Sequence, residues 1–122
     1  MLILLLNAGS SSLKGSLVDA SDGRTIAAAH ADWASETTRY RYTGPEEQTQ
    51  SSDVSWRGHA AAVAQFVRDL TESTSAPLTD GRSLAAVGHR VVHGGEFTSS
   101  VLITPDVRER IAALAELAPL HN

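Results

Sequence analysis

The pattern of apolar and polar positions predicts strands in the first half of the chain. Residues 2–6 are all apolar, which is typical of a strand buried on both faces. Alternation over residues 13–18, before a Ser-Asp-Gly turn, predicts a second strand in an antiparallel hairpin, and residues 24–33 and 37–43 predict two more. The polar stretch 44–54, GPEEQTQSSDV, is expected to be a surface loop.

The second half predicts two helices separated by a strand. Apolar residues recur at helical spacing from Trp56 to Leu70, which predicts an amphipathic helix over residues 56–72. The β-branched stretch within residues 84–96 predicts a strand that ends at a glycine pair.

The last predicted helix has a clear start. Thr104 is a suitable N-cap and Pro105 suits the first helical position, while Pro119 should end the helix. Its buried face is expected at Val107, Ile111, Leu114 and Ala118. The order of elements predicts an α/β fold with a mixed sheet, one face of which has too few helices to cover it.

Charge and composition exclude several classes of protein. Ten basic and fourteen acidic residues give a net charge of -4, and no run of Lys or Arg supplies the positive surface that nucleic acid needs. The absence of cysteine excludes disulfides and thiolate metal sites. Because residues 2–6 are too few for a signal peptide or a membrane span, we expect no membrane partner and a cytoplasmic protein.

The segment NAGSSSLK, residues 7–14, is the first candidate site. Its glycine and serines suit a tight turn that faces phosphate oxygens, and Lys14, the sole lysine, can reach a polyphosphate as a point charge. The Asn7 amide can hold a phosphate or the water of a bound metal. A Walker loop is excluded, because Lys14 lacks a preceding glycine and a following Ser or Thr. A serine-rich turn without a ligand is the alternative.

The segment GHRVVHGGE, residues 88–96, is the second candidate. His89 and His93 have a metal-ligand spacing only on a helix, which the valines and glycines disfavour. A strand would instead place Arg90, Val92 and Gly94 on one face, where they suit a small carboxylate with a short alkyl tail. A solvated surface arginine is the alternative.

NAGSSSLK, GHRVVHGGE and then TPDV followed by APLHN resemble, in this order and spacing, the acetate kinases of the acetokinase family. The resemblance implies a ribonuclease H-like domain of the superfamily of acetate and sugar kinases, actin and heat-shock ATPases. It also implies reversible phosphorylation of acetate by ATP, giving acetyl phosphate and ADP, with Mg²⁺ or alternatively Mn²⁺. Residues 1–122 are expected to be the N-terminal part of the first domain of an enzyme that is homodimeric at full length.

The resemblance further implies roles for single residues. Asn7 would hold magnesium, Lys14, Ser10 and Ser12 the ATP phosphates, Arg90 the acetate carboxylate, and Val92 with Leu120 the acetate methyl, while His121 is the one candidate for a catalytic role. The catalytic aspartate of the family would lie beyond Asn122, so the chain alone is expected to be inactive.

Three further expectations concern Gly15, the substrate and the class of protein. Gly15 stands where the family often has an aromatic residue, and should loosen its strand. A kinase for propionate or another short-chain acid is an alternative within the same class. A remnant that binds phosphate or a protein without catalysis is the alternative from another class.

Overall fold

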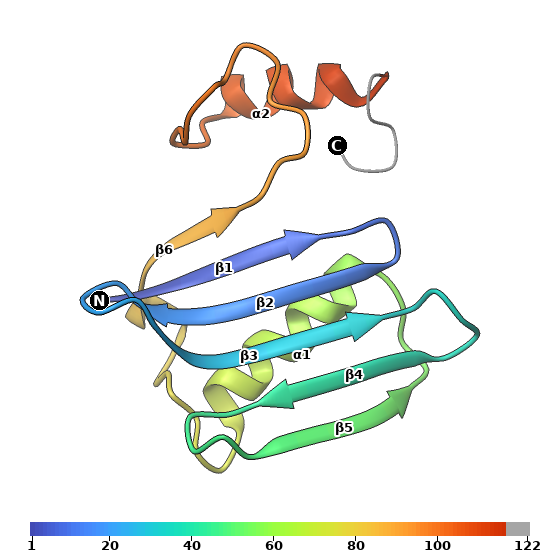
Figure 1. The fold of residues 1–122 in the computed structure, drawn as a ribbon, viewed down its shortest axis with the longest axis vertical. Coiled ribbons are helices and arrows are strands. Elements are labelled where there is room, and N and C mark those ends of the chain that lie inside the picture. The colour runs from blue at the N-terminus through green and yellow to red at the C-terminus, as the bar shows by residue number, and fades with distance from the viewer. Residues whose placement is uncertain (117–122) are drawn as a thin grey trace. The chain divides into compact units, whose positions relative to one another are not determined.

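The computed structural model describes residues 1–116 of the chain (Figure 1). The strands are β1 (Leu2–Ala8), β2 (Ser12–Asp19), β3 (Arg24–Asp32), β4 (Thr38–Thr43), β5 (Thr49–Val54) and β6 (Leu84–His89). The helices are α1 (His59–Glu72) and α2 (Pro105–Ala113), with short 3-10 turns at Gly81–Ser83 and Leu114–Glu116. Packing divides the chain into two compact units, Met1–His89 and Arg90–Asn122, and each is described by itself.

The first unit is a mixed sheet with the strand order β5-β4-β3-β2-β1-β6. Strands β1 to β5 pair antiparallel with their neighbours, whereas β6 pairs parallel with β1. After β5 the chain passes through α1, which lies across one face of the sheet, and returns at the opposite edge as β6 (Figure 1). The predicted α/β fold with a mixed sheet is confirmed.

The polar stretch 44–54 is not a loop throughout, and that prediction was wrong for its second half. Residues Thr49–Val54 form β5, which pairs with β4 from Thr43–Thr49 to Thr38–Val54. All of β5 except Val54 is exposed. A strand with water on both faces has no apolar alternation, so the pattern gave no signal for it.

The core lies between α1 and the sheet. Apolar residues from β1 to β4 meet one face of the helix, and the buried members of the cluster include Leu4, Leu6, Leu13, Leu17, Tyr40, Tyr42, Ala62, Phe66 and Leu70. The helix begins at His59, three residues later than predicted, because Gly58 has a φ of 94° that a helix cannot continue through. Trp56 precedes the helix and packs against the core.

Gly15 on β2 receives the ring of Phe66 from α1. A Cβ atom on Gly15 would lie only 2.6 Å from Phe66 Cδ1, and Phe66 is 1% exposed. The ring therefore occupies the space that a side chain at position 15 would need. Gly15 itself pairs with Leu6 of β1 and Ala29 of β3, and the expectation that it loosens β2 stays a prediction.

A polar bond also ties α1 to the sheet. The Tyr40 hydroxyl donates to Asp69 Oδ2 at 2.6 Å. Burial, and then this hydrogen bond to Asp69, raise the pKa of Tyr40 above its usual value. The phenol therefore stays protonated and keeps β4 attached to the helix.

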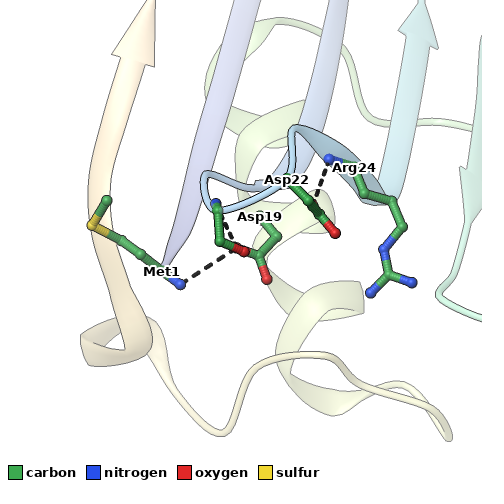
Figure 2. Close-up of polar contacts among 5 residues, drawn as sticks. Met1, Asp19, Asp22 and Arg24 are labelled. Carbon is green, nitrogen blue, oxygen red and sulfur yellow. Dashed lines mark hydrogen bonds and ion pairs between the residues drawn. The ribbon is translucent and has the colours of Figure 1, made fainter.

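Local side-chain bonds shape the turn between β2 and β3 (Figure 2). Asp19 Oδ1 accepts from the Ser21 amide at 2.9 Å and from the amino terminus of Met1 at 3.5 Å. Asp22 Oδ1 accepts from the Arg24 amide at 2.9 Å. The two hydrogen bonds from Ser21 lower the pKa of Asp19 most, and the positive charge of the amino terminus lowers it further. These bonds close the end of the sheet opposite the NAGSSSLK turn.

The second unit contains α2, whose start is as predicted. Thr104 Oγ1 accepts from the Val107 amide at 3.3 Å, and Pro105 occupies the first turn. No residue of α2 is fully buried within the described part of the chain, so the expected buried face at Val107 and Ile111 is only half-buried. The α-helix ends at Ala113 and continues as a 3-10 turn to Glu116. Ala118 and Pro119 lie outside the described residues.

Candidate functional site

The NAGSSSLK segment forms the hairpin that joins β1 to β2. Asn7 pairs with Lys14 across the two strands, and the Gly9 amide donates to the Ser12 carbonyl at 2.8 Å, which leaves Ser10 at the tip. A Cβ on Gly9 would lie 2.7 Å from Ser12 Oγ. A side chain at position 9 would therefore require the Ser12 hydroxyl to rotate away.

Two residues from elsewhere in the sequence fix this hairpin. The Trp33 amide donates to the Ser11 carbonyl at 2.9 Å, and His59 Nε2 lies 2.6 Å from the Gly9 carbonyl oxygen. A carbonyl only accepts, so His59 carries its proton on Nε2. The Trp33 and His59 rings meet edge to face with centroids 4.9 Å apart. No local pattern in the sequence singles out either residue, because the contacts join residues 9 and 11 to residues 59 and 33.

The polar side chains of the hairpin are not engaged in polar contacts with the rest of the described chain. Within residues 1–116, the side chains of Asn7, Ser10, Ser12 and Lys14 form no hydrogen bond or ion pair. The side chains of Asn7 and Lys14 are exposed and lie on the face of the sheet opposite α1. These hydroxyl, amide and ammonium groups are suited to phosphate oxygens.

The donor set fits a magnesium ion that is bound chiefly through a phosphate. Residues 1–116 contain no group of three or more His, Cys, Asp or Glu that could enclose a metal. Asn7 offers one amide oxygen beside Lys14, and Mg²⁺ commonly combines few protein ligands with waters and substrate phosphates. Asn7 could therefore hold such an ion only together with phosphate oxygens and water.

Arg90 and Val92 do not lie on a strand, and that prediction was wrong. Strand β6 ends at His89, which pairs with Leu6 of β1, and both residues follow in irregular, exposed chain. Because β1 is the only neighbour of β6 within the described chain, nothing holds the backbone extended once that ladder stops. The shared face of Arg90, Val92 and Gly94 is therefore not formed by strand alternation.

The tight exit predicted at the glycine pair is present. The Phe97 amide donates to the Gly94 carbonyl at 3.0 Å, and Gly95 has a φ of 58°. The Gly95 amide donates to Nδ1 of His93 at 3.3 Å, so this histidine takes part in the turn. Leu120 and His121 lie outside the described residues, so their predicted roles stay predictions.

A hollow of about 610 Å³ lies on the face of the sheet opposite α1. Three basic residues border it from neighbouring strands: Lys14 pairs with His30 on β3, and His30 pairs with Arg41 on β4. Hydroxyls of Ser16, Thr43 and Thr49 complete its polar lining. The small side chain of Ala28 lies among them and fills little of the space. No carboxylate among the described residues lines this hollow.

Two cations, Lys14 and Arg41, dominate the electrostatics of the hollow. Burial first, and then the charges of Lys14 and Arg41, lower the pKa of His30, while Asp32 opposes this effect. Within residues 1–116, Lys14 and Arg41 have no ion pair, whereas the neighbouring Arg39 is bound to Asp53 at 3.2 Å. Lys14 and Arg41 are therefore not paired with a carboxylate within residues 1–116.

An antiparallel hairpin sheet, a crossover helix and a parallel strand beside β1 define the class of this chain: it has part of a ribonuclease H-like domain of the acetate and sugar kinase, actin and heat-shock ATPase superfamily. The sequence model described as the Acetokinase family matches residues 2–122. The chain belongs to the acetokinase family.

Individual relatives agree with this assignment. The acetate kinase of Thermoanaerobacterium thermosaccharolyticum is 41% identical over 125 residues, which cover 100% of this chain and 31% of that protein. The crystal structure of Porphyromonas gingivalis acetate kinase is 32% identical, with a TM-score of 0.88 over 99% of this chain and 31% of that one. A propionate kinase from Francisella tularensis is also 32% identical, with a TM-score of 0.79 over 98% of this chain and 30% of that one.

The chain spans about 31% of the length of the curated relatives that it matches. Among residues 1–116, no helix has the length and apolar character required to cross a membrane.

Proposed function

We propose that this chain supplies the phosphate-binding hairpin and acceptor-binding residues of an enzyme that converts ATP and acetate to ADP and acetyl phosphate, reversibly. The carrying observation is the family match over residues 2–122. The geometry that supports it is the β1–β2 hairpin, in which Lys14 lies beside Asn7 and the serines stand at the tip. In the reaction, an acetate oxygen bonds to the γ-phosphorus while the bond from that phosphorus to the bridging oxygen of ADP breaks.

The chemistry explains why cations matter most. Acetate is already ionised at neutral pH, so its attack needs little help from a general base, and the main obstacle is the approach of two anions. We propose that Arg90 neutralises and orients the carboxylate, while Lys14, Ser10 and Ser12 contact the ATP phosphates. When bound, Mg²⁺ would withdraw charge from the phosphate oxygens, with Asn7 near it. Mn²⁺ has the same oxygen-ligand preference and could replace it.

Propionate is the second candidate acceptor. The Francisella tularensis propionate kinase and the Porphyromonas gingivalis acetate kinase are both 32% identical to this chain, with TM-scores of 0.79 and 0.88. We propose that Val92 and Leu120 contact the methyl group of acetate. A pocket of this kind distinguishes one extra methylene by only about 1–3 kcal/mol, so both acids can be substrates.

An exchange of segments tests the proposal. Residues 2–122 would replace the matching segment of Porphyromonas gingivalis acetate kinase, and trapping of acyl phosphate with hydroxylamine would compare acetate, propionate and butyrate. We expect Arg90→Ala to lower kcat/KM for acetate about 10- to 100-fold, as loss of a charged hydrogen bond implies. Lys14→Ala should raise the KM for ATP and lower kcat.

Arg82→Ala is the matched control, because Arg82 is exposed in the turn before β6 and has no proposed role. Equal losses for Arg82→Ala and Arg90→Ala would refute the carboxylate role. A folded chimera without kinase activity would instead favour a remnant that binds phosphate or a protein without catalysis. The chain alone spans 31% of its relatives, so we propose that activity, the homodimer and the cytoplasmic location belong to the longer protein.

A further inference from the structure

The hollow on the open face of the sheet is bordered by three basic residues. The roles proposed above for Ser10, Ser12 and Asn7 do not explain why His30 and Arg41 lie there beside Lys14. Lys14, His30 and Arg41 come from three adjacent strands and lie directly opposite one another in register. The lowered pKa of His30 leaves its ring uncharged at neutral pH, so two cations, Lys14 and Arg41, stand on either side of an imidazole that can form hydrogen bonds. An anion between them would be held by both charges and by the ring.

The lining of the hollow favours an oxyanion. Its volume of about 610 Å³ is in the range of small-molecule sites. Thr43 and Thr49 bond to each other through their hydroxyls at 3.0 Å and stand at its border, and Ser16 adds a third hydroxyl. Cations with hydroxyl donors and no carboxylate recognise oxyanions, and phosphate groups accept the largest number of such bonds.

We propose that this hollow binds a phosphate-bearing anion through Lys14, His30 and Arg41, with pyrophosphate as its simplest form. The site extends along the sheet away from the hairpin tip and adds His30 and Arg41 to the phosphate contacts. It shares Lys14 with the proposed ATP site, but it does not depend on kinase activity. A bound anion would favour the protonated form of His30, which burial and then the neighbouring cations otherwise disfavour.

Nuclear magnetic resonance titration of the whole 122-residue chain with inorganic pyrophosphate tests the site. We expect the signals of His30 and Arg41 to shift on binding and the pKa of His30 to rise. Arg41→Gln should weaken pyrophosphate binding about tenfold, as expected for a lost charge-assisted bond. Arg41→Lys keeps the charge but loses the planar guanidinium, so it should weaken binding less than Arg41→Gln does.

Arg39→Gln is the matched control. Arg39 lies two residues from Arg41 on the same strand and the same face, but its charge is already paired with Asp53. Its substitution should change the dissociation constant less than about twofold, because no anion contact is lost.

Two results would overturn the proposal. If pyrophosphate shifts only Ser10 to Ser12 and Arg41→Gln binds like the parent chain, the anion lies at the hairpin tip; the proposed function survives and the hollow is not a site. If a glutamate-rich peptide binds the same residues more tightly than pyrophosphate does, the face is a protein contact. Loss of activity in the segment-exchange enzyme has no bearing on either result, so the two proposals fail separately.

Discussion

The same strands give the sheet two faces with opposite chemistry. Toward α1, β2 places Leu13, Gly15 and Leu17, all buried in the core. Toward the other face it places Lys14 and Ser16, which border a hollow that no helix of the same unit covers (Figure 1). Alternation along a strand assigns neighbouring residues to different environments, so one face can stabilise the fold while the other stays available for binding.

The covered face should account for most of the stability. Phe66 is 1% exposed and fills the space over Gly15, so Phe66→Ala should lower the free energy of unfolding by about 3–5 kcal/mol. Urea unfolding measures this loss. The neighbouring Val67 is 37% exposed, and Val67→Ala should cost less than about 1 kcal/mol. Similar losses for the two variants would mean that α1 is not packed on the sheet through Phe66.

A smaller loss of stability is expected when a side chain is added at Gly15, where the Phe66 ring already fills the space. Gly15→Ala places a methyl group against the Phe66 ring and should destabilise the chain by about 1–3 kcal/mol. Combining it with Phe66→Leu should recover part of the loss, because the two sites share one space. Gly81→Ala is the control, since a Cβ there meets nothing within 4 Å. If Gly15→Ala proves as harmless as Gly81→Ala in urea, the tight fit is refuted.

The smallest effect concerns the open face and pH. Burial and the charges of Lys14 and Arg41 lower the pKa of His30 in the folded chain, against the effect of Asp32. The unfolded chain therefore binds a proton more readily, and stability should fall as the pH drops below the unfolded value of about 6.5. His30→Gln should remove this part of the pH dependence in urea unfolding measured between neutral and mildly acidic pH.

The ring titration gives a second readout of the same electrostatics. Arg41→Gln removes a positive charge and should raise the pKa of His30, as followed by the ring-proton shifts. Arg39→Gln, whose charge is paired with Asp53, should raise it less. A pKa of His30 that stays the same in Arg41→Gln would show that the charge of Arg41 does not act on this ring.

Much of the fold follows from local sequence. The apolar run of β1, the alternation in β2 and the helical spacing of α1 predicted the mixed sheet and its crossover. Strand β5 was missed because both of its faces are polar, and β6 was predicted too long because β-branched residues in sequence do not reveal where a partner strand ends.

The candidate site was predictable where its residues are close in sequence. Asn7 and Lys14 were singled out from NAGSSSLK, and the structure pairs them across the hairpin. His59, which bonds to the Gly9 carbonyl, had no such signal, because the bond depends on how α1 packs. The row from Lys14 to Arg41 was also missed, since its members are set side by side only by the register of three strands.

The sequence by itself therefore determined the local elements, the turn chemistry of the hairpin and the family to which the chain belongs. Periodicity and capping act over a few residues, and each leaves its mark within that distance. The tertiary structure alone decided which side chains share a face, because strand register brings together residues that are far apart in the chain. The cationic hollow opposite the apolar core is the result of that register.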